Sequence, residues 1–149
     1  MEKLFVYSYL WQMDLDDGQK YSSYLDTLFI NTENNTSFED LLLDLETLTD
    51  SESSFMRIKK YVEYETSQFD AFEFGKQLFY ELEIIYCSDK VSLEVFGQKC
   101  YELFNLLPSS IDTLNEPFYK LCYIDDMIQF NSENETREII VEMLDYFKP

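Results

Sequence analysis

Hydrophobic residues recur at helical spacing along most of the chain, most clearly in its last thirty residues. Five apolar residues there fall on one stripe of a helix: Ile139, Ile140, Met143, Leu144 and Phe147. The nearby acidic residues lie largely off this stripe: Glu133, Glu135, Glu138, Glu142 and Asp145. Ser132 and Glu135 precede the stripe as an S-x-x-E sequence, which is typical of a helix start where each side chain binds a free backbone N–H. The pattern predicts a C-terminal helix with a packed face and an acidic solvent face.

The same spacing predicts further helices upstream, over residues 19–30, 37–48, 55–65, 68–86 and 93–107. Ser67 and Asp70 indicate the start of the helix at 68–86. Pro117 is expected at the first position of a short helix capped by Asn115. Residues 31–36 are predicted to form a polar loop.

Residues 3–13, KLFVYSYLWQM, are apolar without a clear period. Their β-branched and aromatic content favours a buried strand, but the run is short enough that a first helix stays open. Only three glycines and three prolines occur in the whole chain, which favours helices over hairpins and loops. We therefore expect an all-α antiparallel helical bundle, with a short strand or an extra helix at its N-terminus.

The length of 149 residues is typical of one domain. Threonine, serine and aspartate from Thr49 to Ser54 form the most plausible internal boundary. Up to Glu52 there are twelve acidic residues against two lysines, and after it eighteen against nine basic residues. We expect a single domain over 1–149, in which residues 1–52 form an acidic N-terminal extension packed on a helical bundle of residues 53–149.

The net charge of −19 accompanies a chain that is 46% hydrophobic and 17% aromatic, so a folded core is expected despite the charge. Nucleic acids and anionic membranes are disfavoured as direct partners, because binding to them requires basic patches. A cationic protein would be attracted over long range. A scaffold domain whose charge only keeps it in solution is the plainer alternative.

Several chemistries are disfavoured by the residues present. Histidine is absent, which removes the commonest general base and the usual zinc pairings, and the isolated glycines form no phosphate loop. The segment Asp14–Gly18 is similar to a calcium loop, but its glycine comes one place early and Leu25 stands where the twelfth-position glutamate belongs. Asp125 and Asp126 point about 100° apart on a helix, which disfavours a shared-proton pair. We predict no catalytic residue, metal or cofactor, with a carboxylate-based hydrolase or metal enzyme as the rival class.

Cys87, Cys100 and Cys122 are odd in number and widely spaced, which fits a reducing compartment better than a disulfide framework. The N-terminal apolar run has no basic segment before it and no small-residue cleavage site after it. It is also shorter than the roughly 18 residues that a membrane span needs. The sequence predicts a cytoplasmic protein that does not bind membranes.

Four short motifs follow one another in the C-terminal two-thirds of the chain: TSQFDAFEF at 66–74, ELF at 102–104, YIDD at 123–126, and a last helix with Glu138, Val141 and Leu144. In this order they resemble the colicin D-type immunity proteins, small helical proteins with similar segments before a final helix. Residues 1–52 lie outside the resemblance. The family places acids directly after its ELF segment, whereas here NLLPSS follows and the next acids are Asp112 and Glu116.

The resemblance implies an immunity protein that blocks the basic active-site cleft of a cognate secreted ribonuclease toxin, one that cleaves tRNA and is delivered by a colicin or a contact-dependent inhibition system. Its carboxylates would mimic RNA phosphates. The partner-binding residues we expect are acids together with one tyrosine: Asp112, Glu116, Tyr123, Asp125, Asp126, Glu133 and Glu135. The alternative is a nucleic-acid-mimic inhibitor of a phage-defence or host nucleic-acid-binding protein, of the anti-restriction or anti-CRISPR type.

Overall fold

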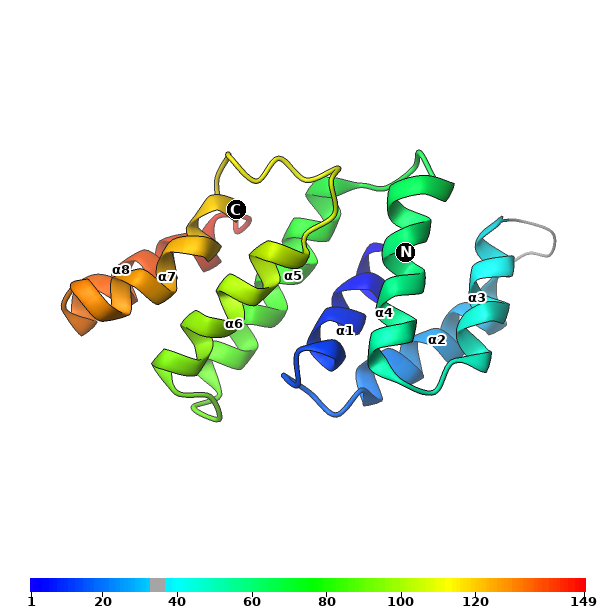
Figure 1. Cartoon of the computed structure of the whole chain (residues 1–149), viewed down its shortest axis with the longest axis horizontal. Coiled ribbons are helices and arrows are strands. Elements are labelled where there is room, and N and C mark those ends of the chain that lie inside the picture. Colours follow the sequence, from blue (N-terminus) through cyan, green and yellow to red (C-terminus); the bar gives the residue numbers. More distant parts are fainter. Residues whose placement is uncertain (33–36) are drawn as a thin grey trace. The chain divides into compact units, whose positions relative to one another are not determined.

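The computed structural model describes residues 1–32 and 37–149. These residues form eight α-helices, one π-helix and no strand (Figure 1). The helices belong to two compact units, Met1–Phe74 and Gly75–Pro149. The all-α helical bundle predicted from the sequence is confirmed. None of the helices in the described residues is long and apolar enough to cross a lipid bilayer.

The first unit holds α1 (Glu2–Gln12), α2 (Gln19–Asn31), α3 (Ser37–Thr47), α4 (Ser51–Lys60) and the π-helix η1 (Tyr61–Glu65). Helix α1 packs against α2 and α4, and α3 packs against the same two helices. The polar loop predicted over residues 31–36 lies mostly outside the described residues.

Helix α1 is the most buried element of the first unit. Consecutive residues along it are buried, so its side chains meet protein on more than one side. The rings of Phe5 and Tyr9 pack on Phe55 of α4, with centroid distances of 5.8 and 4.6 Å. The N-terminal run that admitted a strand or a helix is therefore a core helix.

Helix α4 begins at Ser51, four residues before the start predicted at Phe55. Asp50 caps it, because its carboxylate accepts a hydrogen bond of 2.8 Å from the backbone N–H of Ser53. The polar segment interpreted as a boundary is thus a helix start. The predicted organisation, a single domain with an extension over residues 1–52, stays a prediction. The two compact units divide inside α5, between Phe74 and Gly75.

Four further helices follow: α5 (Ala71–Cys87), α6 (Leu93–Leu106), α7 (Phe118–Phe130) and α8 (Glu133–Asp145). Within the second unit, α7 packs against both α6 and α8. The start of α5 differs from the predicted start at Gln68. Asp70 is the capping residue, and its carboxylate accepts a hydrogen bond of 2.9 Å from the backbone N–H of Glu73.

Helix α7 is longer than the short helix predicted after Asn115. It begins at Phe118, with Pro117 at the capping position and no side-chain cap. The Asn115 amide instead donates to the carboxylate of Asp112 at 2.6 Å. The apolar run Leu121–Ile124 is part of α7, with Leu121 and Ile124 buried.

Helix α8 confirms the predicted C-terminal helix. Ser132 accepts a hydrogen bond from the backbone N–H of Glu135, and the Glu135 carboxylate accepts one from the backbone N–H of Ser132. Of the predicted stripe, Ile140, Met143 and Leu144 are buried, while the other two residues are half-buried. The reciprocal hydrogen bonds of Ser132 and Glu135 satisfy two N–H groups that would otherwise lack partners at the helix start.

Candidate functional site

One ridge of α7 carries acidic and aromatic side chains together. Four of its members follow one another on α7 at spacings of three and four residues, and Glu116, just before the helix, joins them through a hydrogen bond from Tyr119. We call these five residues the α7 ridge: Glu116, Tyr119, Tyr123, Asp126 and Phe130. Residues at these spacings are neighbours on a helix surface. Phe130 is 81% exposed and Tyr123 is 48% exposed. Tyr119 is half-buried, and the two acids are exposed. The ridge therefore presents negative charge and aromatic surface side by side to solvent.

A polar network orders the first half of the ridge. The Tyr119 hydroxyl donates a hydrogen bond of 3.0 Å to the Glu116 carboxylate. The Lys120 ammonium lies 3.2 Å from Glu116 and 3.4 Å from Glu142 of α8, and its side chain is only 12% exposed. The rings of Tyr119 and Tyr123 meet edge to face, with centroids 5.8 Å apart. The network thus links the segment before α7, the helix itself and α8.

Three groups of this network have pKa values shifted away from neutral pH: Glu116, Tyr119 and Lys120. Hydrogen bonds from Lys120 and Tyr119 lower the pKa of Glu116. The hydrogen bond to Glu116 raises the pKa of the Tyr119 hydroxyl. Burial alone would lower the pKa of Lys120, but its hydrogen bonds to Glu116 and Glu142 outweigh burial and raise that pKa. Glu116 is therefore a carboxylate, Tyr119 a neutral phenol and Lys120 an ammonium.

The adjacent acids Asp125 and Asp126 lie in different surroundings. Asp126 is exposed on the α7 ridge, whereas Asp125 is half-buried. The backbone of Asp125 lies against Gly97 of α6, where an added Cβ atom would come within 3.2 Å of the Asp125 Cα atom. Of the predicted acid pair, only Asp126 is placed on the ridge.

The remaining predicted acids are exposed and also serve local structure. The Asp112 carboxylate accepts hydrogen bonds from the backbone N–H of Leu114 at 3.0 Å and from the Asn115 amide. Glu133 forms an ion pair with Arg137 at 2.9 Å, and Glu135 caps α8. The structure therefore groups Glu116, Tyr123 and Asp126 on the ridge and leaves these three acids off it. A direct contact of each with a partner stays a prediction.

Sequence reasoning missed three residues of this region: Tyr119, Lys120 and Phe130. Tyr119 stands four residues before Tyr123, and Phe130 stands four residues after Asp126. Helical spacing alone therefore indicated that these two rings share a face with the predicted residues. The prediction of only a short helix after Pro117 hid that signal, because a ridge needs an uninterrupted helix through Phe130.

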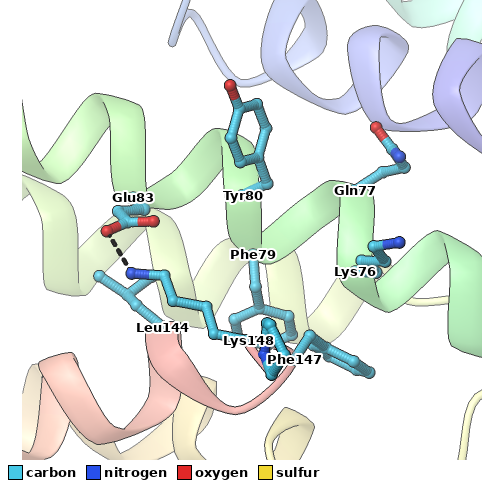
Figure 2. A pocket seen from close by; sticks show the side chains of 9 residues that line it. Lys76, Gln77, Phe79, Tyr80, Glu83, Leu144, Phe147 and Lys148 are labelled. Carbon is cyan, nitrogen blue, oxygen red and sulfur yellow. Dashed lines mark hydrogen bonds and ion pairs between the residues drawn. The ribbon is translucent and has the colours of Figure 1, made fainter.

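A separate pocket of about 300 Å³ lies in the second unit between α5 and the end of α8 (Figure 2). Phe79, Leu144 and Phe147 give it an apolar lining, and Lys148 at its edge binds Glu83 at 2.6 Å. None of the predicted binding residues lines the pocket.

Two acidic side chains of the segment Asp14–Gly18 bind the backbone of their own turn. Its carboxylates accept backbone hydrogen bonds, Asp16 from Gly18 at 2.8 Å and Asp17 from Gln19 at 3.1 Å, so these acids shape the turn into α2. Across residues 1–32 and 37–149, no group of three or more histidine, cysteine or acidic side chains is arranged to hold a metal ion.

The resemblance to the colicin D-type immunity proteins rests on the short motifs described above. No protein-family model matches this chain, and no curated protein or solved structure is significantly similar to it.

Proposed function

We propose that this protein is an immunity protein that binds the basic active-site cleft of a cognate ribonuclease toxin and keeps tRNA out of it. The α7 ridge is the observation that carries this proposal, because it presents acids and aromatic rings together on an ordered helix. The motif resemblance of residues 66–144 supports the same role.

The charge of the chain suits this partner. A nuclease cleft that binds RNA phosphates is lined by basic side chains, and exposed carboxylates fit the positions that phosphates would occupy. With a net charge of −19, long-range attraction steers the two proteins together. Such steering brings association rate constants to about 10⁸–10⁹ M⁻¹s⁻¹ at low salt, and the rate falls as salt is added. Fast capture suits a protein that must neutralise a toxin before it cleaves its substrate.

The aromatic members of the ridge supply contact surface that can be buried at an interface, which the charged members do not. Exposed tyrosines that become buried at an interface are frequent anchors of binding energy. Tyr123 and Phe130 are accessible for this, and Tyr119 is already held in place by Glu116. Anchors of this kind slow dissociation, whereas the charges accelerate association.

The test begins with capture of the partner by the tagged full-length protein in its native host and identification by mass spectrometry. The captured nuclease is then assayed for tRNA cleavage against increasing amounts of this protein. We expect inhibition that is complete at a fixed stoichiometry, and growth protection when both genes are co-expressed. A captured nuclease that stays fully active in the complex would contradict the proposal. Capture of a restriction or phage-defence protein in place of a toxin would favour the nucleic-acid-mimic alternative.

A further inference from the structure

We infer that the α7 ridge recognises arginine, rather than lysine, side chains of its partner, using the tyrosine rings together with the Asp126 carboxylate. The inference deepens the proposed function, on which it rests for the cationic nature of the partner. It names the chemical group that the ridge binds.

The geometry brings a ring and a carboxylate to one exposed face. Tyr123 and Asp126 are three residues apart on α7, and the ring of Tyr119 lies against that of Tyr123. The carboxylates of Glu116 and Glu133 already face basic residues of the chain. Among the residues that the structure describes, none forms an ion pair with Asp126. Asp126 is thus available to an external cation beside the Tyr123 ring.

This combination discriminates between the two basic side chains. A guanidinium is planar, stacks on an aromatic ring and offers a fork of N–H donors to a carboxylate at the same time. A lysine ammonium is a compact, strongly hydrated charge that gains less from the ring. A site made of a tyrosine and an aspartate on one helix face therefore favours arginine.

The chain already contains a filled arrangement of the same kind. The guanidinium carbon of Arg137 lies 5.8 Å from the centroid of the Tyr86 ring, and its Nε donates to Glu133 at 2.9 Å. A second nitrogen of Arg137 donates to the Tyr86 hydroxyl at 2.9 Å. One tyrosine and one carboxylate thus hold a guanidinium on the surface of this protein, and the ridge presents the same two groups to solvent.

The test compares two blocked peptides of equal charge, hexa-arginine and hexa-lysine, titrated into the full-length protein by calorimetry at physiological salt. The two peptides carry the same charge, so the ratio of their affinities reports how much better the protein binds guanidinium than ammonium groups, and the variants show how much of that preference comes from the ridge. We expect hexa-arginine to bind about two- to five-fold more tightly, the range of one exposed cation–ring contact. Tyr123→Leu and Asp126→Asn should each reduce that ratio, and Tyr123→Phe should rescue it because the ring is kept. Tyr64→Leu, at an exposed tyrosine of η1, is the matched control that leaves the ratio unchanged.

Equal affinity for the two peptides would overturn the inference, and so would an arginine preference that survives Tyr123→Leu in a variant with unchanged circular dichroism. The outcome is separable from that of the proposed function. Toxin inhibition without an arginine preference overturns the inference alone. An arginine preference in a protein that captures no toxin overturns the proposed function alone.

Discussion

Gly97 in α6 lies against the backbone of Asp125 in α7. A Cβ atom on Gly97 would stand 3.2 Å from the Asp125 Cα atom and 2.5 Å from the Cδ1 atom of Ile128. The missing side chain lets the two helices approach closely at this point. The contact sets which side of α7 faces α6, and it thereby leaves the ridge with Tyr123 and Asp126 on the solvent side.

Filling this contact should destabilise the second unit. Gly97→Leu is expected to cost about 1–3 kcal/mol through overpacking, which outweighs the helix-propensity gain of about 0.8 kcal/mol from losing glycine. Gln98→Leu, at the exposed neighbouring position, is the control and should stay within about 0.5 kcal/mol of the parent. Urea unfolding measures both. An unchanged unfolding midpoint for Gly97→Leu would show that α6 and α7 do not touch here.

Two properties of Glu135 at the start of α8, its hydrogen bond to the backbone of Ser132 and its negative charge, can be separated by substitution. Ser132→Ala removes an acceptor for a backbone N–H and should lower the free energy of unfolding by about 1 kcal/mol. Glu135→Gln keeps a side-chain acceptor for the N–H of Ser132 and should cost less. Thermal unfolding compares the two, with Asn134→Ala as an exposed control. If Glu135→Gln were the more damaging change, the charge of Glu135 would matter more than its hydrogen bond.

The lowered pKa of Glu116 predicts a pH dependence of stability. A carboxyl whose pKa is lower in the folded than in the unfolded state stabilises the fold fully above its unfolded pKa, about 4.3, and progressively less as pH falls through the folded pKa. The stability difference between the parent and Glu116→Gln should therefore shrink on acidification from neutral pH. Tyr119→Phe removes only one of the two hydrogen-bond donors and should show a weaker dependence. A difference that stays constant with pH would contradict the network.

Charge reversal on the ridge should slow association with the captured partner. Asp126→Lys places a cation where a basic cleft would approach, so the association rate constant should fall, and the effect should diminish as salt is added. Asp26→Lys makes the same charge change at an exposed position of α2 and is the control for net charge alone. Stopped-flow kinetics compares them. Equal slowing by both variants would mean that only total charge matters and that the ridge has no special part.

Removing a ring from α1 should strongly destabilise the first unit. Phe5 is fully buried among the rings of Tyr9, Phe55 and Phe74, so Phe5→Ala should cost about 3–5 kcal/mol. Ile30→Ala, at a residue that is 84% exposed, should be nearly neutral. Guanidinium unfolding is the measurement. Near-neutral behaviour of Phe5→Ala would place α1 outside the core.

Local signals in the sequence predicted α8 correctly. The reciprocal pair of Ser132 and Glu135 involves residues three apart, and the buried stripe of Ile140, Met143 and Leu144 follows directly from helical spacing. Both features depend on neighbouring residues only. Sequence patterns report such short-range features well.

Helix α1 shows why other parts of the fold could not be predicted from the sequence. From Leu4 to Leu10 every residue is buried, so this helix has no polar face and its sequence carries no helical period. This burial depends on tertiary packing against α2 and α4, and α4 is distant from α1 in the sequence. The apolar run by itself could not distinguish a strand from a helix.

The candidate site was predicted in part for a related reason. Composition and motif pointed to Glu116, Tyr123 and Asp126, which the structure groups on one ridge. Asp125 was grouped with Asp126 because the two are adjacent, yet its surroundings depend on Gly97, twenty-eight positions earlier. Contacts between helices, rather than spacing along the chain, decide which of two neighbouring acids stands on the ridge.

A single ammonium, that of Lys120, serves two carboxylates on different elements. Exchanging this lysine for a neutral residue would alter the total charge by one unit and yet uncover two anions together. The electric field would change only as much as it would on adding one acid at the same place, but two carboxylates would lose their cation at once.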